Sequence, residues 1–168
     1  MSIMTLEDLF LHHLKDTYDA EKRLTKALTK MMKAAASAQL QAAFEEHRAV
    51  TETQVQRLEE VFEMLEKPAR GKKCLGMIGL IDEGAELMAE DASDAALDAG
   101  LIAAAQKVEH YEIAAYGTMV TYAEMLGMKQ AVRLLKQTLA EEKQTDEKLT
   151  KLASMINFEA ESEEDGEA

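Results

Sequence analysis

The sequence predicts an all-α protein whose long helices form a four-helix bundle. Good helix formers dominate its 168 residues, and Pro68 is the single proline. Four long segments repeat apolar residues at alternating spacings of three and four, which is the period of a helix that buries one face. Alternating runs of β-branched and aromatic residues, which would indicate strands, are absent from the sequence.

The first two helices are expected to form an antiparallel pair. The first runs from about Thr5 to Ala36, and Thr5-Leu-Glu-Asp8 resembles a capping box at its start. A short connection at Ser37 leads into the second helix, which runs from about Ala38 to Leu65 and stops before Pro68. A connection this short turns the second helix back along the first.

A long connection then leads to the second helix pair. It contains a shorter helix, from about Gly76 to Glu90. The third long helix begins near Ser93 and ends at Gly127, and the fourth runs from Met128 to about Asn157. Two antiparallel hairpins joined by one long crossover form the ferritin-like arrangement of a four-helix bundle. The bundle is expected to span residues 1–158, followed by a disordered acidic tail over residues 159–168.

Composition and charge exclude several classes of function. The formal net charge of −13 argues against a nucleic-acid partner, because DNA repels an acidic surface. The sequence has no run of about 18 apolar residues, so no membrane span is expected. The first residues lack the features of a signal peptide, and the single cysteine, Cys74, fits a reducing compartment. The cytoplasm is therefore the expected location.

The core stripe of each long helix is apolar at its ends and polar in the middle. Five ionisable residues occupy or flank these middle positions: Glu21, His47, Glu109, Glu112 and Glu142. A buried, unpaired carboxylate is costly enough that it tends to take up a proton. Glutamates that meet at one level therefore need a cation, shared protons or a polar network. Oxygen ligands combined with imidazole suit iron or manganese, so these residues are candidate metal ligands.

Counting residues from the turns tests whether these side chains lie at one level. Glu112 lies fifteen residues before Gly127 and Glu142 fifteen residues after it, so the two are expected to face each other. By the same count Glu109 is level with Thr145. Because the three glutamates lie on one helix pair, they are expected to complete one metal position.

The second metal position departs from the usual pattern. A di-iron bundle has Glu-x-x-His on two of its helices. At the level of Glu21, the second helix instead offers Thr51-Glu-Thr-Gln54, and the fourth helix offers Glu142-Lys-Gln-Thr145. A second position therefore needs either His47 or Glu52 to turn inward. The alternative to metal is a buried hydrogen-bond network of the glutamates with the core threonines and with Tyr18, Tyr116 and Tyr122.

Several segments resemble the bacterial YciE/YciF family. They are Asp16-Thr-Tyr-Asp-Ala-Glu-Lys-Arg-Leu24, Gln54-Val-Gln-Arg-Leu-Glu59, Glu141-Glu-Lys-Gln-Thr-Asp-Glu-Lys-Leu149 and the stretch from Leu101 to Gly117. The most specific part is Val108-Glu-His-Tyr-Glu-Ile-Ala-Ala-Tyr116. The resemblance covers nearly the whole chain except the acidic tail. It implies a ferritin-like fold similar to rubrerythrin, a role in bacterial stress responses and a homodimer.

The same resemblance implies roles for individual residues. By position, Glu109, Glu112 and Glu142 match the second-hairpin carboxylates of rubrerythrin-like sites, and Glu21 matches the first-helix carboxylate. The family is often labelled a ferroxidase. One functional hypothesis is therefore a di-iron, or degenerate di-metal, carboxylate protein that oxidises Fe(II) with oxygen or peroxide in stress defence. Its cofactor would be iron, manganese or another divalent metal. The second hypothesis is a non-enzymatic, dimeric helical interaction module with a vestigial metal site.

Overall fold

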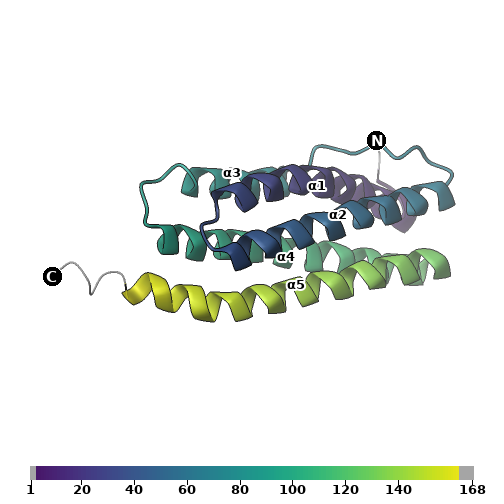
Figure 1. The fold of residues 1–168 in the computed structure, drawn as a ribbon. Helices are drawn as coiled ribbons and strands as arrows, with labels where there is room; N and C mark the ends of the chain where they lie inside the picture. Colours follow the sequence, from purple (N-terminus) through teal and green to yellow (C-terminus); the bar gives the residue numbers. More distant parts are fainter. Residues whose placement is uncertain (1–2, 163–168) are drawn as a thin grey trace.

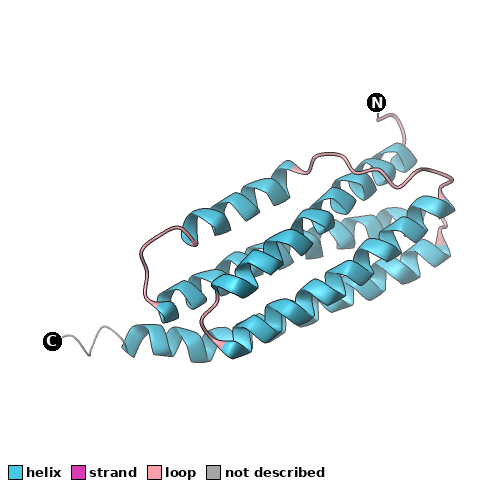
Figure 2. Cartoon of the chain, turned by 45° about the horizontal axis from the view of Figure 1, so that its top comes forward, coloured by secondary structure: helices cyan, strands magenta, loops and turns pink. Residues whose placement is uncertain are grey.

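The protein is a bundle of four long helices with a fifth, shorter helix on its side (Figure 1). A computed structural model describes residues 3–162, which contain five helices and no strand. These are α1 (Leu6–Ala34), α2 (Ala38–Met64), α3 (Leu75–Leu87), α4 (Asp94–Met125) and α5 (Lys129–Ser162). The pairs α1–α2 and α4–α5 are hairpins, and the crossover between them carries α3, which packs on α4 and α1 (Figure 2). The predicted ferritin-like bundle is confirmed.

The helix ends follow from local capping interactions. The Thr5 hydroxyl accepts a hydrogen bond from the backbone N–H of Asp8, and the Asp8 carboxylate accepts one from the backbone N–H of Thr5, both at 3.1 Å. The predicted capping box is therefore present. Gly127 follows the C-cap of α4 with φ at 71°, a left-handed conformation that glycine adopts without strain.

The last helix is longer than the sequence predicts. α5 continues to Ser162, so residues 159–162, predicted as the start of a disordered tail, are helical. Alanine and glutamate are good helix formers, and extending a helix costs much less than nucleating one. The rest of the predicted tail, residues 163–168, lies outside the described residues.

The hydrophobic core is divided into two clusters by a polar layer. One cluster packs around Leu28, Phe44 and Leu101, and the other around Phe10 and Phe62. Buried polar residues lie near the middle of each of the four long helices, where one cluster gives way to the other, among them Glu21, His47, Glu112 and Glu142. The polar middle of each predicted stripe is thus a single layer across the bundle.

A buried carboxylate fastens the α1–α2 turn to α4. Asp98 is 3% exposed and accepts hydrogen bonds from the backbone N–H groups of Ala36, at 2.8 Å, and Ser37, at 2.7 Å. Because Asp98→Ala leaves these donors without a partner, we expect it to lower the free energy of unfolding by about 2 kcal/mol in urea titrations. The matched control is Asp91→Ala, at an exposed loop position, with an expected change below about 0.5 kcal/mol. Equal effects of the two substitutions would contradict this role for Asp98.

Candidate metal centre

Four ionisable side chains from three helices meet in the middle of the bundle. They are His47 of α2, Glu109 and Glu112 of α4, and Glu142 of α5. One potential ligand atom from each lies within 4.8 Å of those from the other three. His47 is 4% exposed and the three glutamates are 0% exposed. Glu112 and Glu142 therefore face each other across the second hairpin, as the residue count predicts.

Glu21, the fifth predicted ligand, borders this group from α1. It is fully buried, and its Oε1 accepts a hydrogen bond from the Tyr116 hydroxyl, while its Oε2 has no hydrogen-bond partner. Burial, and next the charge of Glu142, raise the pKa of Glu21 well above its usual value. Glu21 lies outside the set of four, so its service as a metal ligand stays a prediction.

His47 is the residue of the second helix that turns inward. Its Nε2 lies 3.2 Å from Oε1 of Glu109, yet neither atom makes a hydrogen bond of normal geometry. Burial lowers the pKa of His47 to about 4, so the imidazole is neutral near pH 7 and has a nitrogen lone pair free for a metal. Glu52, the other residue considered for this role, is exposed and pairs with Arg48 at 3.4 Å.

Burial favours the protonated form of the carboxyl groups in this site. Burial is the largest cause, and repulsion between neighbouring carboxylates adds to it; together they raise the pKa of Glu109 and of Glu112 well above the usual range. Burial also raises the pKa of Glu142, to about 7. Burial therefore favours carboxyl groups that keep their protons, and an entering cation would displace those protons.

The site contains every buried side-chain polar atom that lacks a hydrogen-bond partner within residues 3–162. These atoms are Oε2 of Glu21, both ring nitrogens of His47, Oγ1 of Thr51, Oε1 of Gln54, both carboxyl oxygens of Glu109 and of Glu112, and Oε2 of Glu142. Each such atom costs about 1–3 kcal/mol if it stays unpartnered. Carboxylate oxygens and a neutral imidazole are the donors that divalent transition metals take, so the residues present fit a bound divalent cation.

A hydrogen-bonded layer supports Glu142 from α2. The Gln54 amide donates to Oε1 of Glu142 and, at 3.3 Å, to Glu141. Glu141 also receives two hydrogen bonds from the Arg57 guanidinium, at 2.5 and 2.8 Å. The Arg57–Glu141 pair was not predicted from the sequence, although Glu141 lies next to a core glutamate, which could have indicated it. This layer fixes the orientation of the Glu142 carboxyl group.

The predicted tyrosine network is present only in part. Tyr116 is buried and bonds to Glu21, as expected. Tyr18 instead donates to Glu59 at 2.8 Å, and the half-buried Tyr122 contacts the ring of His13. Thr145, at the place where di-iron bundles of the usual pattern carry histidine, donates a hydrogen bond to the backbone carbonyl of Glu141 at 3.1 Å. Hydrogen bonds within the protein therefore leave most of the carboxyl oxygens unpaired.

Fold and site together define the class: a ferritin-like helical bundle with a buried, carboxylate-rich candidate metal centre. None of the described helices is long and apolar enough to cross a bilayer. A family model described as "Domain of unknown function (DUF892)" matches residues 5–161, and the chain belongs to this family.

Named relatives agree with this assignment. The chain is 48% identical to Protein YciF of Escherichia coli (strain K12) over 164 residues, which cover 96% of this chain and 99% of YciF. The crystal structure of the E. coli stress protein YciF matches with a TM-score of 0.89 and covers 92% of this chain and 98% of that one. YcfI from Rhodopseudomonas palustris, 44% identical, matches with a TM-score of 0.87 over 89% of this chain and 95% of that one. The resemblance to the YciE/YciF family is confirmed.

Proposed function

We propose that this protein binds divalent metal, with iron as the preferred ion, in the polar layer of its bundle and oxidises Fe(II) with oxygen or peroxide. One observation carries the proposal: the unpartnered buried carboxyl oxygens and imidazole nitrogens of the described residues converge on a single place. The stress role belongs to the same proposal and rests on the name of the E. coli relative.

The residues that would hold iron are Glu109, Glu112, Glu142 and His47, with Glu21 on the α1 side. Iron is both bound ion and electron source. Two Fe(II) ions give up one electron each, and one O₂ with two protons becomes H₂O₂; alternatively one H₂O₂ with two protons becomes two waters. Both reactions consume Fe(II), and the second also consumes peroxide, which limits oxidative damage under stress.

The protein's own residues supply position and proton balance. The carboxyl groups of Glu109, Glu112 and Glu142 release protons when a cation enters, because the positive charge replaces the proton as the partner of each carboxylate. Tyr116 holds one oxygen of Glu21, and Gln54 holds one oxygen of Glu142, so in each carboxyl group one oxygen stays available.

The function is tested by loading the purified protein anaerobically with Fe(II) and then adding air or H₂O₂. We expect the wild type to oxidise Fe(II) at least about tenfold faster than buffer, and Glu142→Ala to reduce this rate nearly to that of buffer. The matched control is Glu147→Ala, an exposed residue of the same helix, which should retain the wild-type rate. A Glu142→Ala variant as fast as the wild type would count decisively against the proposal.

A non-enzymatic, dimeric stress module is the second candidate. It is favoured by one observation: Thr51, Gln54 and Thr145 stand where a di-iron bundle carries its Glu-x-x-His residues. Elemental analysis of protein made in iron-supplemented medium separates the candidates. Well under one metal ion per chain, with no thermal stabilisation by Fe(II) or Mn(II), favours the module. Both candidates include a cytoplasmic location and a homodimer. Size-exclusion chromatography tests the homodimer.

The metal is expected to enter between α2 and α5. A small cavity of about 30 Å³ lies beside His47 and Thr145, and the exposed Lys148 and Glu46 that border it form an ion pair at 2.7 Å. Because the Lys148 ammonium repels an arriving cation, we expect Lys148→Gln to bind Co(II) about threefold faster at low salt. Stopped-flow absorbance measures this rate, with Lys143→Gln, an exposed lysine of the same helix, as control. Equal acceleration by both variants would point to a general charge effect and against this entry route.

A further inference from the structure

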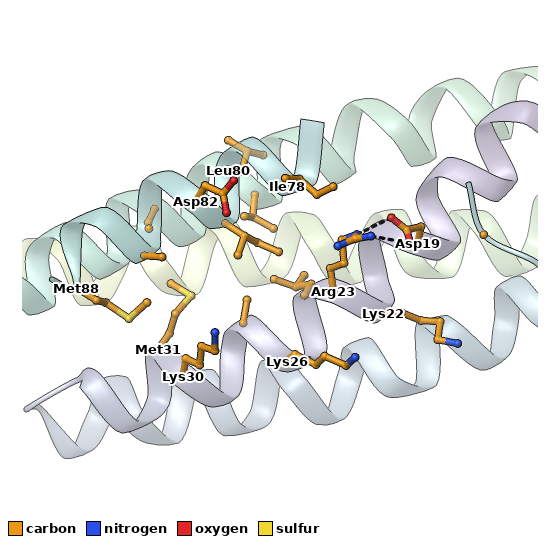
Figure 3. Close-up of a pocket in the computed structure, with 18 of the residues that line it drawn as sticks. Asp19, Lys22, Arg23, Lys26, Lys30, Met31, Ile78, Leu80, Asp82 and Met88 are labelled. Atoms are coloured by element: carbon orange, nitrogen blue, oxygen red, sulfur yellow. Dashed lines mark hydrogen bonds and ion pairs between the residues drawn. The ribbon is translucent and has the colours of Figure 1, made fainter. Parts of the chain in front are cut away.

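A second cavity, separate from the metal centre, lies between α1 and α3. Its volume is about 500 Å³, within the range of small-molecule sites. Most of its lining comes from α1 and α3 (Figure 3). Ala104 and Val108 of α4 also line it. None of the five predicted metal ligands lines it. A ligand of this cavity would therefore not contact the metal centre.

Apolar side chains from both walls line part of this cavity, and small residues such as Ala27, Gly84 and Ala104 leave it open. Its apolar lining includes Leu24, Ala27, Met31, Ile78, Ile81 and Met88. On α1 this lining runs from Leu24 to Met31, which corresponds to about 10 Å of helix. A methyl group added at Gly84 would meet only the Cβ atom of Ala104, at 3.7 Å, an ordinary contact distance. The space is thus an elongated slot with walls suited to a hydrocarbon chain.

The fold alone does not bury most of the apolar residues of α3. Only Met77 and Gly84 of this helix are buried, whereas Ile78, Ile81 and Met88 are partly exposed beside the cavity. Covering exposed apolar surface is favourable because it removes that surface from water. An apolar ligand in the slot would gain this stabilisation from both walls.

The rim on the α1 side is positively charged. Lys22, Lys26 and Lys30 recur every four residues along α1, and Arg23 joins them. Arg23 is engaged by Asp19 at 2.6 Å, and the Lys22 ammonium lies 5.0 Å from the centre of the Tyr18 ring. No carboxylate of residues 3–162 lies within ion-pair distance of Lys26 or Lys30.

This rim stands out on a chain whose net charge is −13. In Figure 3 the Lys30 side chain carries its ammonium group toward the space between the two helices, while Asp82 lies on the α3 side. An anionic group would therefore bind at the lysines of α1, away from Asp82.

We propose that this slot binds a free aliphatic carboxylate, that is, a single-chain fatty acid. Its hydrocarbon chain lies between α1 and α3, and its carboxylate lies at Lys26 and Lys30. The elongated apolar interior selects an unbranched chain, and the two unpaired lysines select one anionic head. A flat protein surface would cover the mouth of the slot but would not fill its depth. Binding is non-covalent and does not depend on the proposed metal chemistry.

The test uses the full-length chain and isothermal titration calorimetry with dodecanoate. Three further probes separate head from tail: dodecanol has the tail alone, acetate has the head alone, and inorganic phosphate is a different small anion. We expect saturable binding of one dodecanoate per chain, weaker binding of dodecanol, and no binding of acetate or phosphate. Binding of acetate or phosphate as tight as that of dodecanoate would overturn the proposal.

Substitutions at the head and tail regions should act differently. Lys26→Gln with Lys30→Gln should weaken dodecanoate binding about tenfold and leave dodecanol binding unchanged. The control is Lys33→Gln, which lies outside the cavity lining. Ala27→Phe fills the slot and should abolish binding of both probes. Because Ala27 is buried, Ala85→Phe, at an exposed position in the lining, is a second blocking variant in case Ala27→Phe does not fold.

Three results would overturn the proposal. The first is undiminished dodecanoate binding to a folded blocking variant. The second is binding to anionic lipid vesicles without binding of free dodecanoate. The third is no dodecanoate binding together with loss of a dimer in Ala85→Phe on size-exclusion chromatography, which would make the slot an interface between copies of the chain. Failure of Fe(II) oxidation would leave the binding result unaffected, so the two proposals fail separately.

Discussion

The metal-free protein is expected to lose stability as the pH rises from 6.5 to 8.5. The unfolded chain releases the glutamate protons near pH 4.5, whereas folded Glu142 releases its proton near pH 7, and burial with neighbouring carboxylates raises the pKa of Glu21, Glu109 and Glu112 well above the usual value. The folded state binds more protons throughout this range, so its stability falls as the pH rises. For Glu142 alone, the shift from 4.5 to about 7 corresponds to about 3 kcal/mol in total, of which about 1 kcal/mol is lost above pH 6.5.

The ionisable groups near these carboxyl groups determine the pH range in which the loss of stability is clearest. The pKa of His47, lowered to about 4, acts in the opposite direction: below pH 6.5 the unfolded state binds the extra proton. Gln54 is uncharged, and the Arg57 guanidinium lowers the pKa of Glu142 only as a minor influence. Above pH 6.5 the glutamates therefore determine whether stability rises or falls with pH.

Urea unfolding of chelator-treated protein at pH 6.5, 7.5 and 8.5 measures this dependence. Saturating Mn(II) should reverse the slope, because deprotonated carboxylates bind the ion and each proton released favours the bound state. A flat profile without metal, unchanged by Mn(II), would show that the carboxyl groups are not buried together as described.

The second large effect is expected from Glu112→Gln. This substitution should stabilise the metal-free protein and reduce the stabilisation that Mn(II) gives. Both carboxyl oxygens of Glu112 are buried and unpartnered, and its pKa is raised by burial and by Glu21, Glu142 and Glu109. A neutral amide of the same size removes the cost, at pH 8, of either keeping the proton or burying the charge of this group. We expect the free energy of unfolding of metal-free protein at pH 8 to rise by about 2 kcal/mol.

The same substitution should remove most of the stabilisation by Mn(II), because an amide oxygen is a far weaker ligand than a carboxylate. Differential scanning calorimetry with and without Mn(II) measures both effects. Glu147→Gln, an exposed glutamate of α5, is the control and should change neither. If Glu112→Gln destabilises the metal-free protein and keeps its response to Mn(II), the Glu112 carboxyl group is neither costly to bury nor a metal ligand.

The sequence predicts local features of this fold well. The capping box at Thr5 and the turn at Gly127 follow from residue types whose preferences act within one helical turn. The facing of Glu112 and Glu142 follows from equal distances to a tight turn, because a helical hairpin fixes the level of its two arms. The helical end of α5 was missed because acidic, helix-forming residues fit both a tail and a helix.

Contacts between distant segments were much harder to predict. Asp98 bonds to a turn about sixty residues earlier in the chain, and nothing in its neighbourhood marks it as buried. The cavity between α1 and α3 depends on how far the crossover helix stands from α1, which small residues on α1, α3 and α4 decide together. The lysines of the rim on α1 indicate a binding site only because that cavity lies beside them.

The sequence by itself determined that four amphipathic helices form a bundle and that each places polar groups midway along its buried face, because helical periodicity sets which face a residue occupies. Only the tertiary structure decided that His47 turns inward while Glu52 stays in solvent, and that Tyr116 and Gln54 each take one carboxyl oxygen and leave the others unpaired. The reason is that rotation and depth of each helix depend on packing against three others, which no single helix encodes.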